Sequence, residues 1–257
     1  MEVHHHPHVD KKGFKEYFLE FLMIFLAVTL GFFAESYREY LSERSKEKEY
    51  INSLLEDLKS DSTFLDVSIH ILIPYHVKWI DSTEHLLQMP GIKNKNREIY
   101  QAFITATAWT YDFHPTERTL SQLHTEGFHL IRNEKTSKAI SQIEDQYKLF
   151  SPANTLFQNM QSDIDVAAYT FAEPVITGTL FAKGFKNNKI FSLKLSDIPP
   201  DVPIKYADTK VFTIYIDKLH QYNFYMQAAI KPDYTNILQE LTKTIYILKK
   251  EYHLENE

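Results

Sequence analysis

Histidines near the start of the chain form the densest group of side chains that could do chemistry. His4, His5, His6 and His8 fall within five positions. Neutral imidazoles bind zinc, copper or nickel, so four of them this close together could chelate one ion. The other interpretation is a solvated tail whose histidines gain charge as the pH falls. These four residues are the candidate metal ligands of the sequence.

A second group of histidines lies near the middle of the chain. His124 and His129 flank Glu126, but their spacing differs from the HExxH pattern of helical zinc sites. Residues five apart point to different faces of a helix, so the pair is poorly placed to share a metal ion. We expect these residues to be ordinary polar groups at a helix end.

Acidic residues recur along one predicted helix, at Glu56, Asp57, Asp61 and Asp66. Paired carboxylates can bind a divalent cation or act as acid and base. Asp57 and Asp61 are one helical turn apart, which is also typical of a solvated helix face beside lysines such as Lys59. We expect the solvated face.

Several activities are disfavoured by what the sequence lacks. It has no cysteine, which removes disulfides, thiolate metal sites and a catalytic thiol. It contains no GxxxxGK[ST], GxGxxG, GxSxG or HExxH motif, so the common nucleotide-, dinucleotide- and serine-dependent enzymes are disfavoured. A net charge of −6 disfavours a nucleic-acid partner. We expect no catalytic residue and no cofactor.

One apolar stretch, residues 17–34, dominates the hydropathy pattern. Eleven of its residues are Leu, Ile, Phe or Val. Eighteen residues make about 27 Å of helix, close to the thickness of a bilayer core. Their insertion is favourable by about 5 kcal/mol, and the one charge, Glu20, lies near an end. The stretch therefore predicts a single transmembrane helix and makes the lipid bilayer a partner.

Two other interpretations apply to this stretch. The uninterrupted apolar run covers only residues 21–34, a length that also suits a buried helix or a signal peptide. A buried helix of a soluble protein normally shows a polar stripe, and this run is apolar all round. No small-residue cleavage site follows at a suitable distance, so we expect the segment to be retained as an anchor.

The chain beyond the anchor continues with a helical pattern, and no glycine or proline occurs between Phe32 and Ile73. Its apolar residues are spaced alternately four and three apart, with Ser62 as the one defect, at Ile51, Leu55, Leu58, Leu65, Ile69 and Leu72. Such a heptad seam is compatible with a coiled coil between two copies, and equally with one helix of an intramolecular bundle. Pro74 should kink or end the helix near Ile73.

The rest of the sequence predicts more helices. Asn133 is suited to cap a helix that begins near Glu134, and the C-terminal stretch carries apolar residues at helical spacing. Val175–Phe181 and Lys189–Leu195 are β-permissive and could form a small hairpin near 175–195. The expected fold is mainly α, with a tail at 1–16, a transmembrane helix at 17–36 and a helical bundle at 37–257.

Two segments carry a resemblance. The opening EVHHHPHVDKKGFKEYFLEFLMIFLAVTLGFFAE and the later ERTLSQLHTEGFHLIRNEKTSKAISQIEDQY resemble a family of single-span, membrane-anchored bacterial proteins with a histidine-rich leader. The likeness is specific over residues 1–60 and looser over 113–150. It implies the inner membrane of a Gram-negative bacterium. That family has no assigned activity, so no catalytic residue is carried over.

These observations favour a non-enzymatic interaction or scaffold protein, anchored by one span and working within a membrane complex or as a homo-oligomer. We expect a cytoplasmic N-terminus and a periplasmic helical domain. One alternative is a ligand-sensing helical domain, because aromatic residues are frequent from Tyr206 to Tyr252. A cavity lined by Tyr222, Tyr225 or Trp109 would favour it. A membrane-tethered hydrolase is the other alternative.

Overall fold

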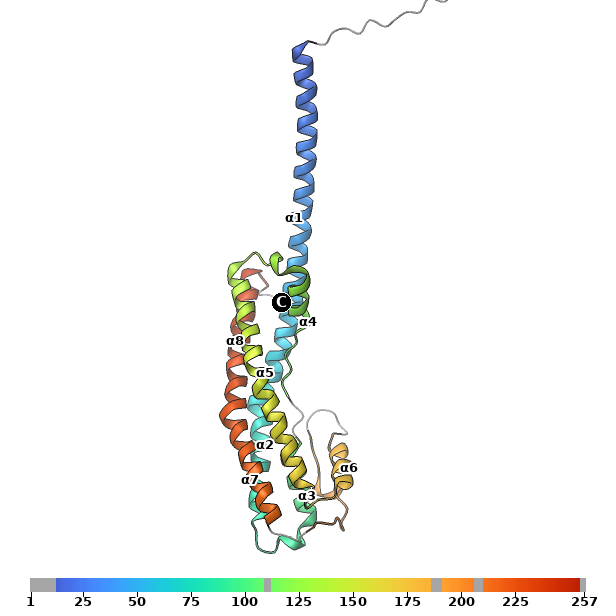
Figure 1. The fold of residues 1–257 in the computed structure, drawn as a ribbon, viewed down its shortest axis with the longest axis vertical. Helices are drawn as coiled ribbons and strands as arrows, with labels where there is room; N and C mark the ends of the chain where they lie inside the picture. The colour runs from blue at the N-terminus through green and yellow to red at the C-terminus, as the bar shows by residue number, and fades with distance from the viewer. Residues whose placement is uncertain (1–12, 109–111, 186–190, 206–209, 255–257) are drawn as a thin grey trace, which may run out of the picture. The chain divides into compact units, whose positions relative to one another are not determined.

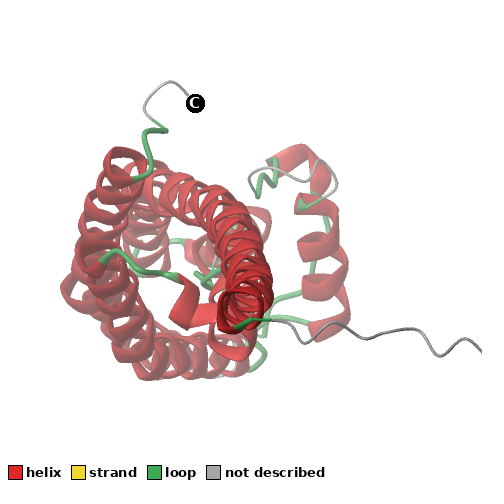
Figure 2. Ribbon diagram, turned by 90° about the horizontal axis from the view of Figure 1, so that it is seen from above, coloured by secondary structure: helices red, strands yellow, loops and turns green. Residues whose placement is uncertain are grey.

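The computed structural model describes residues 13–108, 112–185, 191–205 and 210–254. The chain divides into two compact units, Met1–Ile51 and Asn52–Glu257. Helix α1, Phe14–Val67, contributes to both. The described residues are helical apart from turns and loops, with no strand drawn in Figure 2. The fold is mainly α, as the composition predicts.

Three long helical rods build the second unit, here called the helical domain. The first joins the end of α1 to a π-helical turn, η1 (Ser68–Leu72), and then to α2 (Ile73–Leu87). The second is α5, Glu134–Ala168. The third joins α7 (Lys210–Tyr225), a π-turn η6 (Met226–Ile230) and α8 (Lys231–Glu251), which Figure 1 shows end to end.

Shorter helices complete the domain. These are η2 (Ile92–Asn94), α3 (Asn96–Thr107), α4 (Arg118–Gln122), η3 (Leu123–Gly127), η4 (Phe128–Leu130), α6 (Pro174–Gly184) and η5 (Leu195–Asp197). The largest sets of contacts join α2 to α3, α5 to α8 and α5 to α7. The core of the domain therefore lies among these antiparallel and stacked helices.

The heptad seam is buried inside the domain. Its members from Leu55 to Leu72 are at most 6% exposed. Burying one leucine contributes about 1.5–3 kcal/mol, so this surface is already used within one chain. Of the two interpretations of the seam, the intramolecular bundle describes the structure.

The prolines modify the rods without ending them. At Pro74 the α-helical hydrogen bonds change to a π-turn, and α2 begins at Ile73 with the proline in its first turn. Pro152 lies inside α5, which continues to Ala168. The side chain of Asn133 caps α5 as expected, accepting a hydrogen bond from the Thr136 amide at 3.1 Å.

The prediction of a hairpin near 175–195 is wrong. Residues 175–181 belong to α6, where Pro174 occupies the first turn, a position that favours a helix start. Thr177, Leu180 and Gly184 recur at helical spacing and are buried, so packing outweighs the local preference of valine and isoleucine for strands. Residues 189 and 190 lie outside the described part, and 191–194 form no strand.

Candidate functional site

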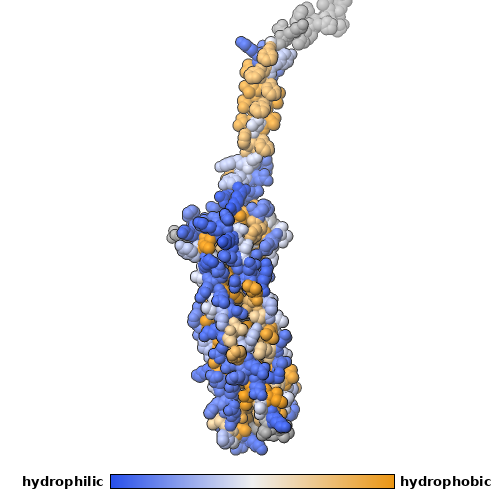
Figure 3. Space-filling view, turned by 60° about the vertical axis from the view of Figure 1, so that its left-hand side comes forward, coloured by the Kyte–Doolittle hydropathy of each residue, from blue (hydrophilic) through white to orange (hydrophobic). Residues whose placement is uncertain are grey.

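The apolar segment of α1 is the first candidate site, and Figure 3 shows it as a band of hydrophobic residues. One helix of the described residues, beginning at Phe14, is long and apolar enough to cross a membrane. No part of its most apolar window is buried. Leu26 is 47% exposed and Phe33 63%. Apolar side chains point outward all around the helix, a surface that water solvates poorly.

Polar and amphipathic residues mark the two ends of this segment. Tyr17 and Tyr37 are exposed, about one bilayer core apart along the helix. Beyond the C-terminal end, Arg38 donates to Glu35 at 2.5 Å, and Arg44 donates to Glu47 at 2.7 Å. Tyrosines and charged pairs at the ends are typical of a helix that passes from hydrocarbon into a headgroup region.

Asp57 and Asp61 form the second candidate site, and the expectation that they lie on a solvated face is wrong. Each is 4% exposed. Asp57 accepts hydrogen bonds from the Thr119 amide and hydroxyl and from the Arg118 guanidinium, the last at 2.9 Å. Buried carboxylates are costly unless such donors surround them.

Asp61 is surrounded in the same way. It accepts from the Thr116 amide at 3.0 Å, from the Thr116 hydroxyl at 2.7 Å and from the Tyr147 phenol at 2.7 Å. Burial, followed by the charge of Asp61, raises the pKa of Tyr147. The phenol therefore stays protonated and keeps donating. The two aspartates hold the turn that leads into α4 against α1 and α5, so their role is to position chain segments.

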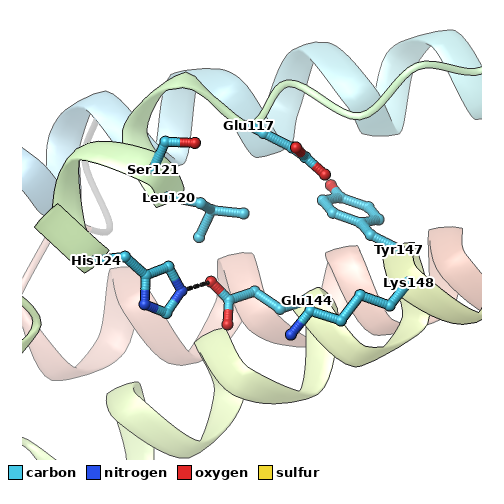
Figure 4. A pocket seen from close by; sticks show the side chains of 7 residues that line it. All are labelled: Glu117, Leu120, Ser121, His124, Glu144, Tyr147 and Lys148. Atoms are coloured by element: carbon cyan, nitrogen blue, oxygen red, sulfur yellow. Dashed lines mark hydrogen bonds and ion pairs between the residues drawn. The ribbon is translucent and has the colours of Figure 1, made fainter.

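A small pocket lies next to this cluster, and Figure 4 shows the side chains around it. It has a volume of about 130 Å³. Its lining residues are Glu117, Leu120, Ser121, His124, Glu144, Tyr147 and Lys148. Pockets for drug-sized ligands are usually about 300–1000 Å³, so this one is too small for most organic ligands.

Two polar side chains of the pocket interact directly with each other. His124 Nε2 and Glu144 Oε1 are 2.5 Å apart, and the imidazole stacks on Phe128. In Figure 4 the Ser121 hydroxyl points away from the His124 imidazole, so these two side chains are not arranged as a nucleophile and its base. The His124–Glu144 contact joins η3 to α5 and has the character of a structural link.

The histidine predictions have different outcomes. His4, His5, His6 and His8 lie outside the described residues, so metal binding there stays a prediction. Among the residues that the structure does describe, no group of three or more His, Asp or Glu side chains could hold a metal ion. His124 pairs with Glu144 and His129 is exposed, so the two histidines share no ligand.

Aromatic residues of α7 belong to the core. Tyr215 and Tyr222 are fully buried, and the Tyr222 ring stacks on Phe157 at 4.7 Å between centroids. Burial raises the pKa of both phenols, with the nearby carboxylate of Asp165 adding to it. Trp109 lies outside the described residues. Tyr222 therefore fills the interior and does not line a ligand cavity.

Two features of the domain escape sequence reasoning. The donors to Asp57 and Asp61 come from residues 55 to 86 positions away, so local spacing carries no signal for them. Asp165 is the other, because burial raises the pKa of its carboxyl to about 6. The signal in the sequence is its position on α5 next to Ile164 and Ala167, which are buried and indicate that the Asp165 carboxylate is partly buried as well.

Comparison of the chain with family models, with curated proteins and with solved structures finds no match. The functional argument therefore depends on the geometry described above.

Proposed function

We propose that residues 17–36 cross a membrane and that the helical domain is a non-enzymatic interaction module tethered by them. The observation that carries the proposal is the complete exposure of the apolar window in α1. A core helix of a soluble protein would bury at least one face of such a surface against its own chain. Lipid is the solvent that suits a helix apolar all round.

The proposed setting is the inner membrane of a Gram-negative bacterium, with a cytoplasmic N-terminus and a periplasmic domain. Three lysines precede the span and four basic residues follow it closely, so the charge counts alone do not set the orientation. A large domain can be translocated whatever its charge. The resemblance of residues 1–60 to membrane-anchored bacterial proteins supports the same setting.

An interaction role is supported by the surface of the helical domain. Leu149 is 72% exposed, Phe224 68% and Val175 82%, on three different helices. Aromatic residues are enriched at the core of protein interfaces, whereas single exposed apolar side chains also occur on surfaces that bind nothing. Because the heptad seam is buried, self-association or binding to another membrane protein would use these outer faces. The small pocket next to the aspartate cluster has no room for most organic substrates, which favours an interaction role.

The membrane part of the proposal is tested by extracting membranes with alkaline carbonate. The full-length chain should remain in the pellet, whereas release into the supernatant would contradict the anchor. Orientation can be read with a single cysteine, because the natural chain has none. Ser82→Cys, at an exposed site on α2, should react with a membrane-impermeant maleimide from the periplasmic side. Reaction only after lysis of the inner membrane would reverse the orientation.

The interaction part is tested by cross-linking in cells, purification in detergent and mass spectrometry. We expect either a defined membrane-protein partner or a mass of more than one chain. The double variant Leu149→Glu/Phe224→Glu tests these surfaces: it should fold but no longer bind the partner. A monomeric mass with no reproducible partner would contradict the interaction role, while leaving the anchor intact.

A further inference from the structure

All three rods of the helical domain contain a proline away from their ends. Pro74 follows η1, Pro232 follows η6 and Pro152 lies inside α5. In a continuous α-helix the residue at each position would donate its amide to the carbonyl four residues earlier. Proline has no amide hydrogen, and its ring also collides with that carbonyl. Each rod therefore lacks a hydrogen bond at its proline.

Two of the rods respond in the same way. The Ile73 amide donates to the Ser68 carbonyl, and the Lys231 amide donates to the Met226 carbonyl. Each bond spans five residues instead of four and ends at the residue just before a proline. A π-turn widens the helix locally and relieves the proline clash. The third π-turn of the described residues, η3, has no such proline.

The three prolines lie at one level of the domain. A groove of about 470 Å³ is lined on one side by residues of α2 that include Ile73 and Pro74, and on the other by Gln227 of η6 and Lys231 of α8, so the start of α2 faces η6. Helix α5 contacts η6 directly. The Tyr225 hydroxyl, at the end of α7, donates to the Ala153 carbonyl, next to Pro152, at 3.4 Å.

Residues 112–117, between α3 and α4, form an irregular segment that on the first rod lies beside Phe64, ten residues before Pro74. Phe113 packs against Phe64, Phe150 and Tyr234, and its amide donates to the Tyr234 hydroxyl at 3.1 Å. Among the described residues, no rod crosses this level with a complete α-helical set of hydrogen bonds.

The buried core runs through this level, where Ile73, Met226 and Ile230 are at most 1% exposed, and it continues on both sides. One side contains Leu58, Leu65, Ile140, Ile143, Leu241 and Leu248, and the other contains Ile80, Ile99, Phe103, Phe171, Tyr215 and Leu219. Bending of the rods concentrates where the regular backbone hydrogen bonds are interrupted and a groove leaves free space.

We propose that this proline level is a hinge, at which the two halves of the helical domain bend relative to each other. Bending closes or opens the groove between α2 and η6, so the outer faces that contact a partner change their mutual angle. Hinges of this kind absorb motion in a few residues while the packed halves move as bodies. The hinge does not depend on the membrane span, since every contact in the argument lies within the helical domain.

Spin-label distances test the hinge directly, because the chain has no native cysteine. The pair Gln221→Cys and Thr242→Cys places one label on α7 and one on α8, on both sides of Pro232, at exposed positions. The control pair, Asn236→Cys and Lys250→Cys, lies within α8. In the full-length protein in nanodiscs, the pair across the hinge should give a distance distribution at least about twofold broader than the control pair. Equal widths would overturn the proposal.

The prolines themselves supply the matched test. The triple variant P74A/P152A/P232A restores three amide donors at exposed positions and should narrow the distribution across the hinge to the width of the control pair. Pro174→Ala, at the first turn of α6, is also exposed but lies outside the hinge and should leave the distribution broad. A triple variant that stays as broad as the natural chain would overturn the proposal.

Hydrogen exchange on the unmodified chain gives an independent measurement, should the triple variant fail to fold. Amides of residues 69–73 and 227–231 should exchange at least about tenfold faster than those of 55–66 and 240–248. Uniform protection along the rods would overturn the hinge.

Discussion

Two stretches of the same helix, α1, differ in the exposure of their leucine side chains. In residues 17–34 every large apolar side chain named above is exposed, with Leu26 at 47%. In residues 52–67 the four leucines are buried, with Leu58 at 1%. The backbone is α-helical throughout both stretches. The difference lies in the arrangement of apolar residues around the helix, all round in the first and in one stripe in the second.

The contrast shows that hydrophobicity alone does not build a core. A stripe can be covered by neighbouring helices of the same chain, and the polar face opposite then meets water. A helix that is apolar on every side needs a different solvent or other chains around it. The four predictions below test whether the two stretches obey these different rules.

The largest effect is expected from charges in the exposed stretch. The double variant Leu26→Arg/Val28→Arg should cost about 6 kcal/mol of membrane insertion, more than the favourable contribution of the whole segment. The protein should move from the carbonate-resistant pellet to the supernatant. Ile214→Arg, at an exposed site on α7, is the control and should leave the protein in the pellet. A double variant that stays in the pellet would break the comparison.

Truncating one leucine in each stretch should change the free energy of unfolding by different amounts. Leu58→Ala should reduce the free energy of unfolding of the helical domain by about 2–5 kcal/mol, through lost burial and a cavity. Leu26→Ala, in the same helix, should change it by less than about 0.5 kcal/mol. Denaturant unfolding in detergent, followed by near-ultraviolet circular dichroism, measures both. Similar losses for the two variants would contradict the assignment of Leu26 to a surface.

Charge inside the helical domain gives a third contrast. Asp61→Ala leaves the donors of Thr116 and Tyr147 buried without an acceptor and should cost about 2–3 kcal/mol of domain stability. Asp66→Ala, one turn away and exposed, should cost less than about 0.5 kcal/mol. The same unfolding assay applies. A neutral Asp61→Ala would show that the aspartate cluster does not hold α4.

The smallest effect is a dependence on pH. Burial raises the pKa of the Asp165 carboxyl to about 6, above its ordinary value of 3.8, so the native state binds more protons than the unfolded state between these values. Stability is therefore lost as the pH rises through this window, and a charged, partly buried carboxylate remains above it. Asp165→Asn should stabilise the domain by about 1–2 kcal/mol near pH 7.5, after allowance for partial exposure, and by little near pH 4.

Two features make this measurement interpretable. Burial lowers the pKa of His76 to about 4, so that residue titrates in an overlapping range. Its contribution is common to both proteins and cancels in the difference. Asp163→Asn, at an exposed site on the same helix, is the control and should show no such pH-dependent gain. A gain that is equal at both pH values would contradict the proposed titration of Asp165.

Local patterns were sufficient for much of the fold. The helix over the apolar segment, the helical stripe from Leu55 to Leu72 and the cap at Asn133 each depend on residues close in sequence, and the structure contains all three. The hairpin failed because residues 175–181 pack as a helix: Leu180 and Gly184 are buried, and the Phe191 ring lies against Gly184 and contacts Phe181. The small pocket could not be predicted, since it joins side chains of η3, α4 and α5.

Periodicity acts over a few turns, so the order of residues is enough to specify a mainly helical chain with one all-round apolar segment and one striped helix. Which polar groups are buried depends on how the helices pack. Asp57 and Asp61 have the spacing of a solvated face, yet donors from far along the chain enclose them. The alignment of Pro74, Pro152 and Pro232 at one level is likewise a property of packing, since residues so distant in sequence meet only when the rods assemble.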